Sequence, residues 1–336
     1  MRYSKKVHRS TSGLFEIMNF VDEEYNGTIA KDVREGLTAS QKYLPCKYLY
    51  DASGSKLFED ICCLPEYYPT RTELSILEDI APELMGGFNH KELVELGSGA
   101  NVKIRVLLDA AGKTNRATLR YIPVDISESA VIEASLDLIE RYPELQVLGI
   151  VADFTSQLDL VPTEYPLMFC FLGSTIGNME KEESISFLQS VSENMKWEDR
   201  LLIGFDMVKS RETLESAYND AQGTTSEFNK NILSVLNNEL NADFDSSCFD
   251  HLAFYNDEHD RIEMHLRAKC DFSVNIESIG EQIEFHEGET IHTENSRKFT
   301  RKSIEDMARQ ANLNVENWHS DPNGWFSIVE MVPSIH

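Results

Sequence analysis

Short apolar runs alternate with amphipathic stretches through the middle of the chain, from about residue 90 to residue 208. A short apolar run is typical of a buried strand, whereas apolar residues recurring every three or four positions, as in Ile104, Leu107, Leu108 and Ala111, are typical of one helix face. Strands alternating with helices indicate a parallel sheet with helices on both faces. The pattern predicts strands at 92–97, 119–125, 146–152, 166–173 and 200–208, and helices at about 102–112, 128–141 and 181–195.

The flanking regions show other patterns. Residues 1–19 are polar and mildly basic, and we expect a loose N-terminal arm there. Because Pro69 disfavours a helix at Tyr68, we expect the tyrosine pair before it to be extended and a helix to begin at Thr72. The remaining predicted elements are helices at 32–44, at 57–61, within 210–240 and from 303, and strands at 262–268, 284–286, 314–319 and 325–332.

A glycine-rich turn, Glu95-Leu96-Gly97-Ser98-Gly99-Ala100-Asn101, joins the first central strand to its helix. Glycines let a ligand approach the main chain, and the start of the helix offers unpaired N–H groups. Alone, such a turn is as typical of a structural turn as of a cofactor loop. Position 102 is Val102 instead of the third glycine of a dinucleotide loop, while Glu95 and Asp125 end strands where acidic side chains suit ribose hydroxyls. This combination favours S-adenosylmethionine (SAM) over NAD.

The end of the chain, a helix followed by two strands, resembles the end of a class I methyltransferase. We therefore predict an α/β fold, with a class I (Rossmann-like) SAM methyltransferase core and a mixed α+β inserted substrate domain. The expected SAM-binding core is 72–208 plus 298–336, and the expected substrate-binding domain is 20–71 plus 209–297. We expect the substrate to lie in the crevice between them.

Composition narrows the class of partner. The formal net charge of −26 makes nucleic acid and anionic membranes poor partners. No apolar run reaches the length of a membrane span, and the N-terminus has no apolar core of a signal peptide. The six cysteines form no C-x-x-C pattern, which favours reduced thiols. We expect a cytoplasmic monomer that acts on a small molecule.

Several further motifs accompany the glycine turn and resemble the SAM-dependent histidine Nα-methyltransferases of ergothioneine biosynthesis. The resemblance covers roughly residues 30–336 and is specific, because most of these motifs are not general to methyltransferases. In chain order they are Tyr50-Asp51 before Gly54-Ser55, Leu64-Pro65-Glu66-Tyr67-Tyr68-Pro69-Thr70-Arg71-Thr72-Glu73, Glu95-Leu96-Gly97-Ser98-Gly99, Pro123-Val124-Asp125-Ile126-Ser127, Phe171-Leu172-Gly173-Ser174-Thr175-Ile176-Gly177-Asn178, Ala217-Tyr218-Asn219-Asp220, Ile262-Glu263-Met264 and Thr293-Glu294-Asn295-Ser296.

The resemblance implies an activity and a set of site residues. The family adds up to three methyl groups to the α-amino nitrogen of L-histidine, forming trimethylhistidine (hercynine). In this chain SAM would contact Gly97, Lys103, Asp125, Asp153, Phe154 and Tyr50. Tyr67 would lie near the amino group, Asn178 and Tyr218 would hold the carboxylate, and Glu294 and Ser296 would bind the imidazole beside Met264. Tyr50 and Tyr67 would be the catalytic residues nearest the reacting centre, although a water relay is an equally good base.

Several of these residues, taken one at a time, also suit a purely structural role. Tyr67 suits a core, Asn178 suits a helix N-cap, and Glu294 suits a solvated strand. His265 and His292 belong to a histidine-rich region with irregular spacing, and we expect no metal. Two rival functions remain open: N-methylation of another amino acid or amine, and SAM binding without catalysis.

Overall fold

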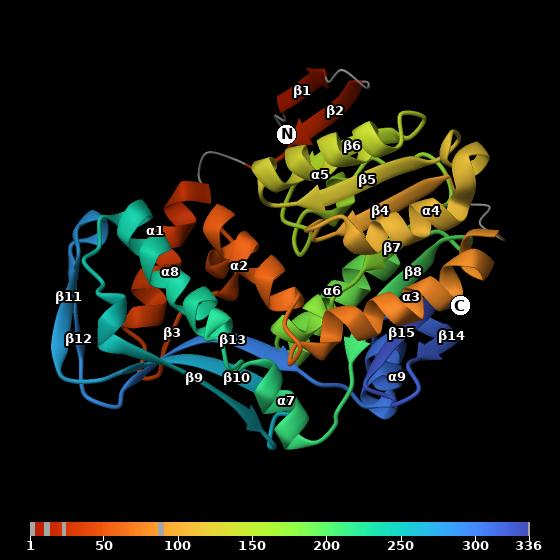
Figure 1. Cartoon of the computed structure of the whole chain (residues 1–336). Helices are drawn as coiled ribbons and strands as arrows, with labels where there is room; N and C mark the ends of the chain where they lie inside the picture. The colour runs from red at the N-terminus through yellow and green to blue at the C-terminus, as the bar shows by residue number, and fades with distance from the viewer. Residues whose placement is uncertain (1–3, 10–13, 22–24, 87–90, 335–336) are drawn as a thin grey trace. The chain divides into compact units, whose positions relative to one another are not determined.

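The computed structural model describes residues 4–9, 14–21, 25–86 and 91–334, and divides the chain into two compact units (Figure 1). Unit 1 comprises Met1–Val21, Pro69–Met207 and Phe299–His336, and unit 2 comprises Asp22–Tyr68 and Val208–Lys298. The sequence placed the internal boundaries after residues 71, 208 and 297, within three residues of these. That unit 1 binds SAM and unit 2 the amino acid stays a prediction.

Unit 1 is built on one large sheet whose order is β1-β2-β6-β5-β4-β7-β8-β15-β14. The strands from β2 to β8 run parallel, whereas β15 is antiparallel to both of its neighbours. The central strands are β4 (Glu92–Leu96), β5 (Arg120–Asp125), β6 (Gln146–Val151), β7 (Leu167–Phe171) and β8 (Arg200–Asp206), followed near the C-terminus by β14 (Leu313–Ser320) and β15 (Phe326–Pro333). The predicted α/β fold class is confirmed.

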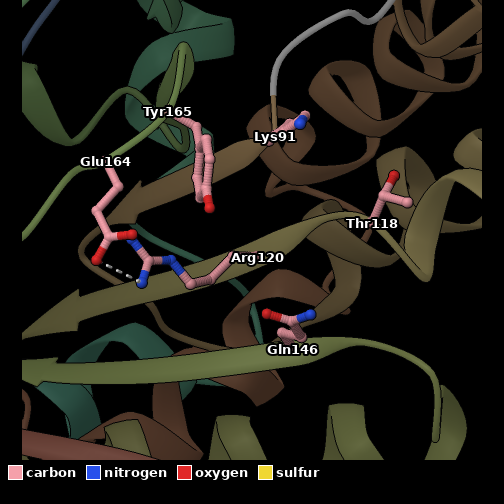
Figure 2. Close-up of a pocket in the computed structure, with 6 residues that line it drawn as sticks. All are labelled: Lys91, Thr118, Arg120, Gln146, Glu164 and Tyr165. Atoms are coloured by element: carbon pink, nitrogen blue, oxygen red, sulfur yellow. Dashed lines mark ion pairs between the residues drawn. The ribbon is translucent and has the colours of Figure 1, made fainter.

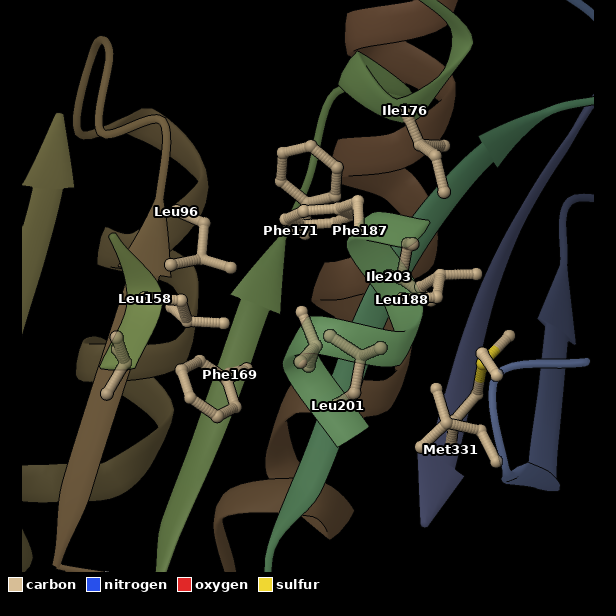
Figure 3. Close-up of a cluster of buried hydrophobic side chains, with 14 of the residues drawn as sticks. Leu96, Leu158, Phe169, Phe171, Ile176, Phe187, Leu188, Leu201, Ile203 and Met331 are labelled. Atoms are coloured by element: carbon tan, nitrogen blue, oxygen red, sulfur yellow. The ribbon is translucent and has the colours of Figure 1, made fainter. Parts of the chain in front are cut away.

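Helices cover both faces of this sheet, because the central strands are apolar on both sides. On one face, α3 (Tyr68–Gly86), α4 (Val102–Arg116) and α5 (Glu128–Arg141) pack on Leu93 and Tyr121. On the other, α6 (Lys181–Glu193) and α9 (Arg301–Gln310) pack on the cluster drawn in Figure 3. There the rings of Phe171 and Phe187 lie 4.7 Å apart between centroids.

The expectation of a loose arm over residues 1–19 is wrong for its described part. β1 (Ser4–Arg9) and β2 (Leu14–Asn19) form a hairpin, and β2 extends the main sheet by pairing with β6. Phe15 and Ile17 are fully buried on the face of the sheet that α3, α4 and α5 cover. This alternating apolar pair is the signal that the polar average composition concealed; residues 1–3 and 10–13 lie outside the described residues.

Two predicted helix boundaries are also wrong. Helix α3 begins at Tyr68 and not at Thr72. Pro69 therefore occupies the first turn of the helix, where its missing N–H costs nothing and its fixed φ suits the helix. The helix expected at 32–44 is α1 (Tyr25–Leu37), and the chain then enters the short strand β3 (Lys42–Tyr43).

Unit 2 combines helices with a four-stranded sheet of order β3-β13-β10-β9. Strands β9 (Phe249–Asn256), β10 (Arg261–Ala268) and β13 (Thr290–Arg297) are antiparallel, and β11 (Phe272–Ile276) pairs separately with β12 (Glu281–Phe285). The helices are α2 (Ala52–Cys62), α7 (Arg211–Ala217), α8 (Thr224–Leu240) and α1. Short 3₁₀ turns occur in both units: η1 (Cys46–Leu49), η2 (Leu158–Leu160), η3 (Thr175–Asn178), η4 (Ser246–Cys248) and η5 (Glu277–Ile279).

Among the described residues, no helix combines the length and the apolar character that crossing a bilayer requires.

Candidate active site

In the glycine turn of unit 1, the backbone of Gly97 lies next to the aromatic ring of Phe154. Gly97 follows β4 with φ of +73°, a conformation that side chains disfavour, and its N–H donates to the Val124 carbonyl at 2.9 Å. A Cβ placed on Gly97 would lie 3.7 Å from the Phe154 ring. The half-buried Phe154 packs edge-on against Phe171 and Phe187. Backbone without a Cβ beside this aromatic ring leaves room for a flat heterocycle.

Carboxylates end the two neighbouring strands. Burial raises the pKa of Asp125 to about 6, although N–H groups of Ser127 and Ile126 partly offset this effect. Asp153 follows β6, and its Oδ1 accepts from the Thr155 N–H at 2.9 Å and hydroxyl at 2.6 Å. A half-buried carboxylate such as Asp125 gains from hydroxyl donors, because burial has removed its water. Asp125 therefore fits a ligand that offers hydroxyl donors.

Glu95 is held in place by a partner in its own sheet. Burial raises its pKa to about 7, and the Tyr121 hydroxyl donates to it. The sequence grouped Glu95 with the cofactor loop, but its side chain is buried and engaged with β5.

Lys103, in the first turn of α4, is fixed by a residue that the sequence analysis missed. Its Nζ lies 2.6 Å from Oε2 of Glu73, which is fully buried on α3. The same carboxylate accepts the Gly173 N–H at 2.7 Å and 3.0 Å. A Cβ on Gly204 would lie 2.3 Å from Glu73 Oε1, so the sheet needs glycine there. Glu73 shares the apolar stripe of Ile76, and a charge on such a stripe was the available signal.

Asn178 lies in unit 1, at the end of η3 after β7. It is half-buried and follows Ser174, whose φ of +56° and αL conformation turn the chain at the end of the strand. Asn178 therefore shares the carboxyl edge of the sheet with Gly97 and Asp125. The other residues predicted to contact histidine all belong to unit 2.

Three of those residues share one face of the β10–β13 pair. Met264 is opposite Glu294, and Ile262 is opposite Ser296. Because side chains alternate along a strand, Met264, Glu294 and Ser296 point to the same side. A register shift after Met264 brings Glu294 into this pairing, since the next partners are His265 and His292. The local spacing of the sequence does not reveal such a shift.

Glu294 is a buried carboxylate with spare hydrogen-bonding capacity. Its exposed fraction is 8%, and its Oε2 has no hydrogen-bond partner among the described residues. Burial raises its pKa to about 8, although the ammonium of Lys298 lowers it. A buried acceptor without a partner is costly and is typical of a ligand site. Glu294 thus fits a ligand that supplies an N–H.

Unit 2 also contains a cluster of aromatic side chains around Tyr50 and Tyr67. Tyr50 lies 5.6 Å from Phe58 and 5.3 Å from Phe228 between ring centroids, and Tyr67 lies 6.1 Å from both Phe58 and Tyr218. Burial raises the pKa of Tyr50 and of Tyr67 well above the usual range, and the charge of Glu294 adds to this effect. Both hydroxyls therefore keep their protons near neutral pH, which disfavours a phenolate base.

Tyr218 and Ser296 are joined by a cation that the sequence analysis also missed. The Tyr218 hydroxyl donates to Ser296 Oγ at 2.7 Å. Lys298 Nζ donates to Ser296 Oγ at 2.7 Å and to Tyr218 Oη at 3.1 Å. The alternation of Glu294, Ser296 and Lys298 along one strand was the signal that could have found it.

A possible metal site occurs on β10 and β13. Ligand atoms of Glu263, His265 and His292 all lie within 4.8 Å of one another. However, the rings of His265 and His292 are stacked 4.6 Å apart with planes only 10° apart. A metal ion binds in the plane of an imidazole, so one ion cannot serve both rings unless a ring rotates. Glu263 is also already paired with Arg261.

A hollow of about 350 Å³ lies at the opposite ends of the strands (Figure 2). Its lining residues precede or begin β4 to β7, whereas the predicted SAM residues of unit 1 end or follow strands of this sheet. Glu164 pairs with Arg120 across it at 3.9 Å. None of the predicted site residues lines this hollow, which is bounded by Lys91, Thr118, Arg120, Gln146, Glu164 and Tyr165.

Comparisons with a protein family and with individual proteins all point to histidine methyltransferases. The family described as histidine-specific, SAM-dependent methyltransferase matches residues 29–333. The chain is 40% identical over 300 residues to a histidine N-alpha-methyltransferase of Mycolicibacterium smegmatis, covering 89% of this chain and 93% of the relative. It is 39% identical over 302 residues to the Mycobacterium tuberculosis protein of the same name, with the same coverage.

A more distant relative is ergothioneine biosynthesis protein 1 of Schizosaccharomyces pombe, 30% identical over 243 residues, which are 69% of this chain and 31% of that protein. Since the family match spans nearly the whole chain, including both units, the protein belongs to the histidine-specific, SAM-dependent methyltransferases.

Proposed function

We propose that this enzyme transfers methyl groups from SAM to the α-amino nitrogen of L-histidine, up to trimethylhistidine, as the first step of ergothioneine biosynthesis. The observation that carries the proposal is the buried Glu294 oxygen that has no hydrogen-bond partner among the described residues, on the same strand face as Ser296. An imidazole offers a donor to Glu294 and a second nitrogen to Ser296. A phenylalanine ring would leave both unpaired, a loss that a polar site can convert into about 10⁴-fold rejection.

SAM supplies the electrophilic methyl group. We assign its binding to Gly97, Lys103, Asp125, Asp153 and Phe154, with Tyr50 as a further contact. The fit rests on three features: backbone without Cβ at Gly97, the half-buried acceptor Asp125, and the fixed ring of Phe154. Holding the two reactants in line can provide about 7–11 kcal/mol of the acceleration in well-aligned cases.

We assign histidine to Tyr67, Asn178, Tyr218, Met264, Glu294 and Ser296. We assign the carboxylate to Asn178, a neutral donor, and to the Tyr218 side chain, whose own hydroxyl hydrogen is donated to Ser296 Oγ. Met264 packs beside the imidazole. The α-amino group must lose a proton before it attacks, and desolvation among tyrosines favours its neutral form. The faces of Tyr50 and Tyr67 suit a quaternary ammonium product. Because both tyrosines stay protonated, we propose a water as the proton acceptor and these hydroxyls as positioning groups.

Mass spectrometry of an incubation with SAM and a panel of amino acids tests the proposal. We expect histidine to gain one, two and three methyl masses in succession, while tryptophan, phenylalanine and tyrosine gain none. Methylation of another amino acid in preference to histidine would favour the rival acceptor. SAM binding without turnover on any member of the panel would favour a non-catalytic protein.

We also propose that the enzyme acts in the cytoplasm as a monomer that needs no metal. The six cysteines, all within the described residues, form no disulfide, which suits a reducing compartment. Activity that survives extensive dialysis against a chelator would support the metal-free chemistry.

A further inference from the structure

Lys298 is a buried cation at the end of β13 with its side chain turned toward the proposed imidazole site. Its exposed fraction is 3%, and its backbone N–H donates to the Asp260 carbonyl at 2.6 Å. Its Nζ donates to Ser296 Oγ and Tyr218 Oη and lies 4.9 Å from the centre of the Tyr218 ring. Burying an ammonium is expensive, so a structural role alone would be served as well by an apolar side chain.

The contacts of this cluster run in one direction, from Lys298 and Tyr218 to Ser296. An ammonium has donors and no acceptor, whereas a hydroxyl has one donor and two acceptor positions. Ser296 Oγ accepts from both Lys298 and Tyr218, so both of its acceptor positions are filled. The part of the chain that the structure describes offers no acceptor to the Ser296 hydroxyl hydrogen. Ser296 can therefore only donate to a ligand.

We infer that Lys298 is a positioning residue that makes Ser296 an obligate hydrogen-bond donor, so that the site selects a neutral imidazole with its N–H on Glu294. This inference rests on the proposed function and adds the protonation state and tautomer of the bound substrate. One ring nitrogen donates to the ionised Glu294, and the other accepts from Ser296. No additional residue contacts the reacting nitrogen in this scheme.

The alternatives fail on hydrogen-bond direction. An imidazolium carries N–H groups on both nitrogens, and one of them would face Ser296, which has no acceptor position left. A protonated Glu294 would donate to the unprotonated ring nitrogen and leave the N–H of the neutral ring facing Ser296. Either arrangement buries two donors against each other, at a cost comparable to a lost hydrogen bond.

Proton release on binding is the consequence that can be measured. Free Glu294, with a pKa of about 8, is largely protonated at pH 7. The imidazole of free histidine, with a pKa near 6.5, is mostly neutral. Selection of ionised Glu294 and neutral ring therefore releases about one proton per bound ligand at pH 7. Without selection, Glu294 keeps its proton or passes it to the ring, and the release is near zero.

Calorimetric titration with trimethylhistidine, in two buffers of different ionisation enthalpy, counts these protons. This ligand has a quaternary nitrogen, so its amino group cannot contribute. We expect about one proton released by the wild type and by K298R, which keeps the donors. We expect K298M and S296A to release close to none, and the exposed Lys269→Met control to match the wild type.

Loss of the Lys298 charge would by itself raise the number of protons released, whereas the inference predicts that K298M releases fewer. Removing the cation raises the pKa of Glu294, so enforced ionisation would then release at least as many protons as in the wild type. A merely structural Lys298 would weaken binding without changing the count. A K298M count equal to that of the wild type overturns the inference. If K298M does not fold, S296A and K298R decide between the same outcomes.

Failure of the proposed function gives a different result. In that case the wild type binds neither histidine nor trimethylhistidine, and no proton count is obtained. A wild type that binds trimethylhistidine without releasing a proton leaves the function standing and overturns the role of Lys298.

Discussion

Glu73 in unit 1 and Glu294 in unit 2 are both buried carboxylates on regular elements, yet their surroundings differ. Glu73 is paired with Lys103 and accepts the Gly173 N–H, so its own chain satisfies it. Glu294 has an oxygen without a partner in the described structure, and burial raises its pKa to about 8. The first carboxylate is satisfied within its own unit, whereas the second keeps an acceptor oxygen that we propose a ligand fills. This contrast distinguishes a structural charge from a recognition charge.

The largest expected effect is a loss of histidine methylation in a unit 2 variant whose affinity for SAM is unchanged. Glu294→Ala should lower kcat/KM for histidine by about 10³–10⁴-fold, because the imidazole N–H loses its acceptor. The Kd for SAM should change less than about twofold, since its assigned contacts lie elsewhere. Asp125→Ala should do the reverse, raising the Kd for SAM about 10–100-fold while trimethylhistidine binds normally. Initial rates and calorimetry measure both.

The exposed Glu284→Ala is the matched control in unit 2, and should behave as the wild type. Equal loss of SAM and histidine binding in Glu294→Ala would contradict the assignment of separate roles.

The second effect concerns Glu73. Glu73→Gln removes the charge that pairs with Lys103 and should destabilise the protein by about 2–4 kcal/mol, because the change leaves a largely buried ammonium unpaired. The melting temperature should fall by about 5–10 °C. Glu78→Gln, an exposed position on the same helix, should melt like the wild type. A Glu73→Gln protein as stable as the wild type would show that this ion pair contributes nothing.

The smallest effect has the opposite sign and depends on pH. Glu294 has a pKa of about 8 in the fold and about 4.3 in an unfolded chain. Between these values the folded state binds more protons than the unfolded state, so the free energy of unfolding falls as pH rises. The Glu294→Gln variant does not lose this part of its stability as the pH rises, because glutamine does not titrate. Without ligands, its melting temperature should match the wild type near pH 4.5, exceed it by about 2–5 °C at pH 5.5, and exceed it further as the pH rises toward 8.

Thermal unfolding across this pH range provides the measurement. Glu95 and Asp125 also have raised pKa values, but both proteins share them, so they cancel in the difference. A difference that stays constant from pH 4.5 to pH 8 would mean that Glu294 is not desolvated.

The sequence was most informative where structure is local. The strands around Gly97 and Asp125 were predicted within one or two residues, because buried parallel strands have an apolar pattern that short windows reveal. The N-terminal strand β2 was missed, because Phe15 and Ile17 become core residues only by pairing with β6. Tyr68 was misplaced because a proline rule for helix interiors was applied at a helix start.

The candidate site divides in the same way. The motifs resemble the family that the comparisons show, and it was this resemblance that named Glu294 and Ser296. Two supporting residues, Glu73 and Lys298, were not found, since their roles depend on partners tens of residues away. A local pattern can suggest that a charge is buried, as on the apolar stripe of α3, but it does not show which partner satisfies that charge.

By itself, the sequence determined the α/β alternation, the acidic strand ends and the motifs of a histidine-specific methyltransferase. Only the tertiary structure decided which carboxylate is satisfied and which is not. It also showed that Met264, Glu294 and Ser296 share one face of the β10–β13 pair, and that Lys298 donates a hydrogen bond to Ser296. The physical reason is that periodicity reports a residue's own element, whereas burial and hydrogen-bond direction depend on neighbours that folding brings from distant parts of the chain.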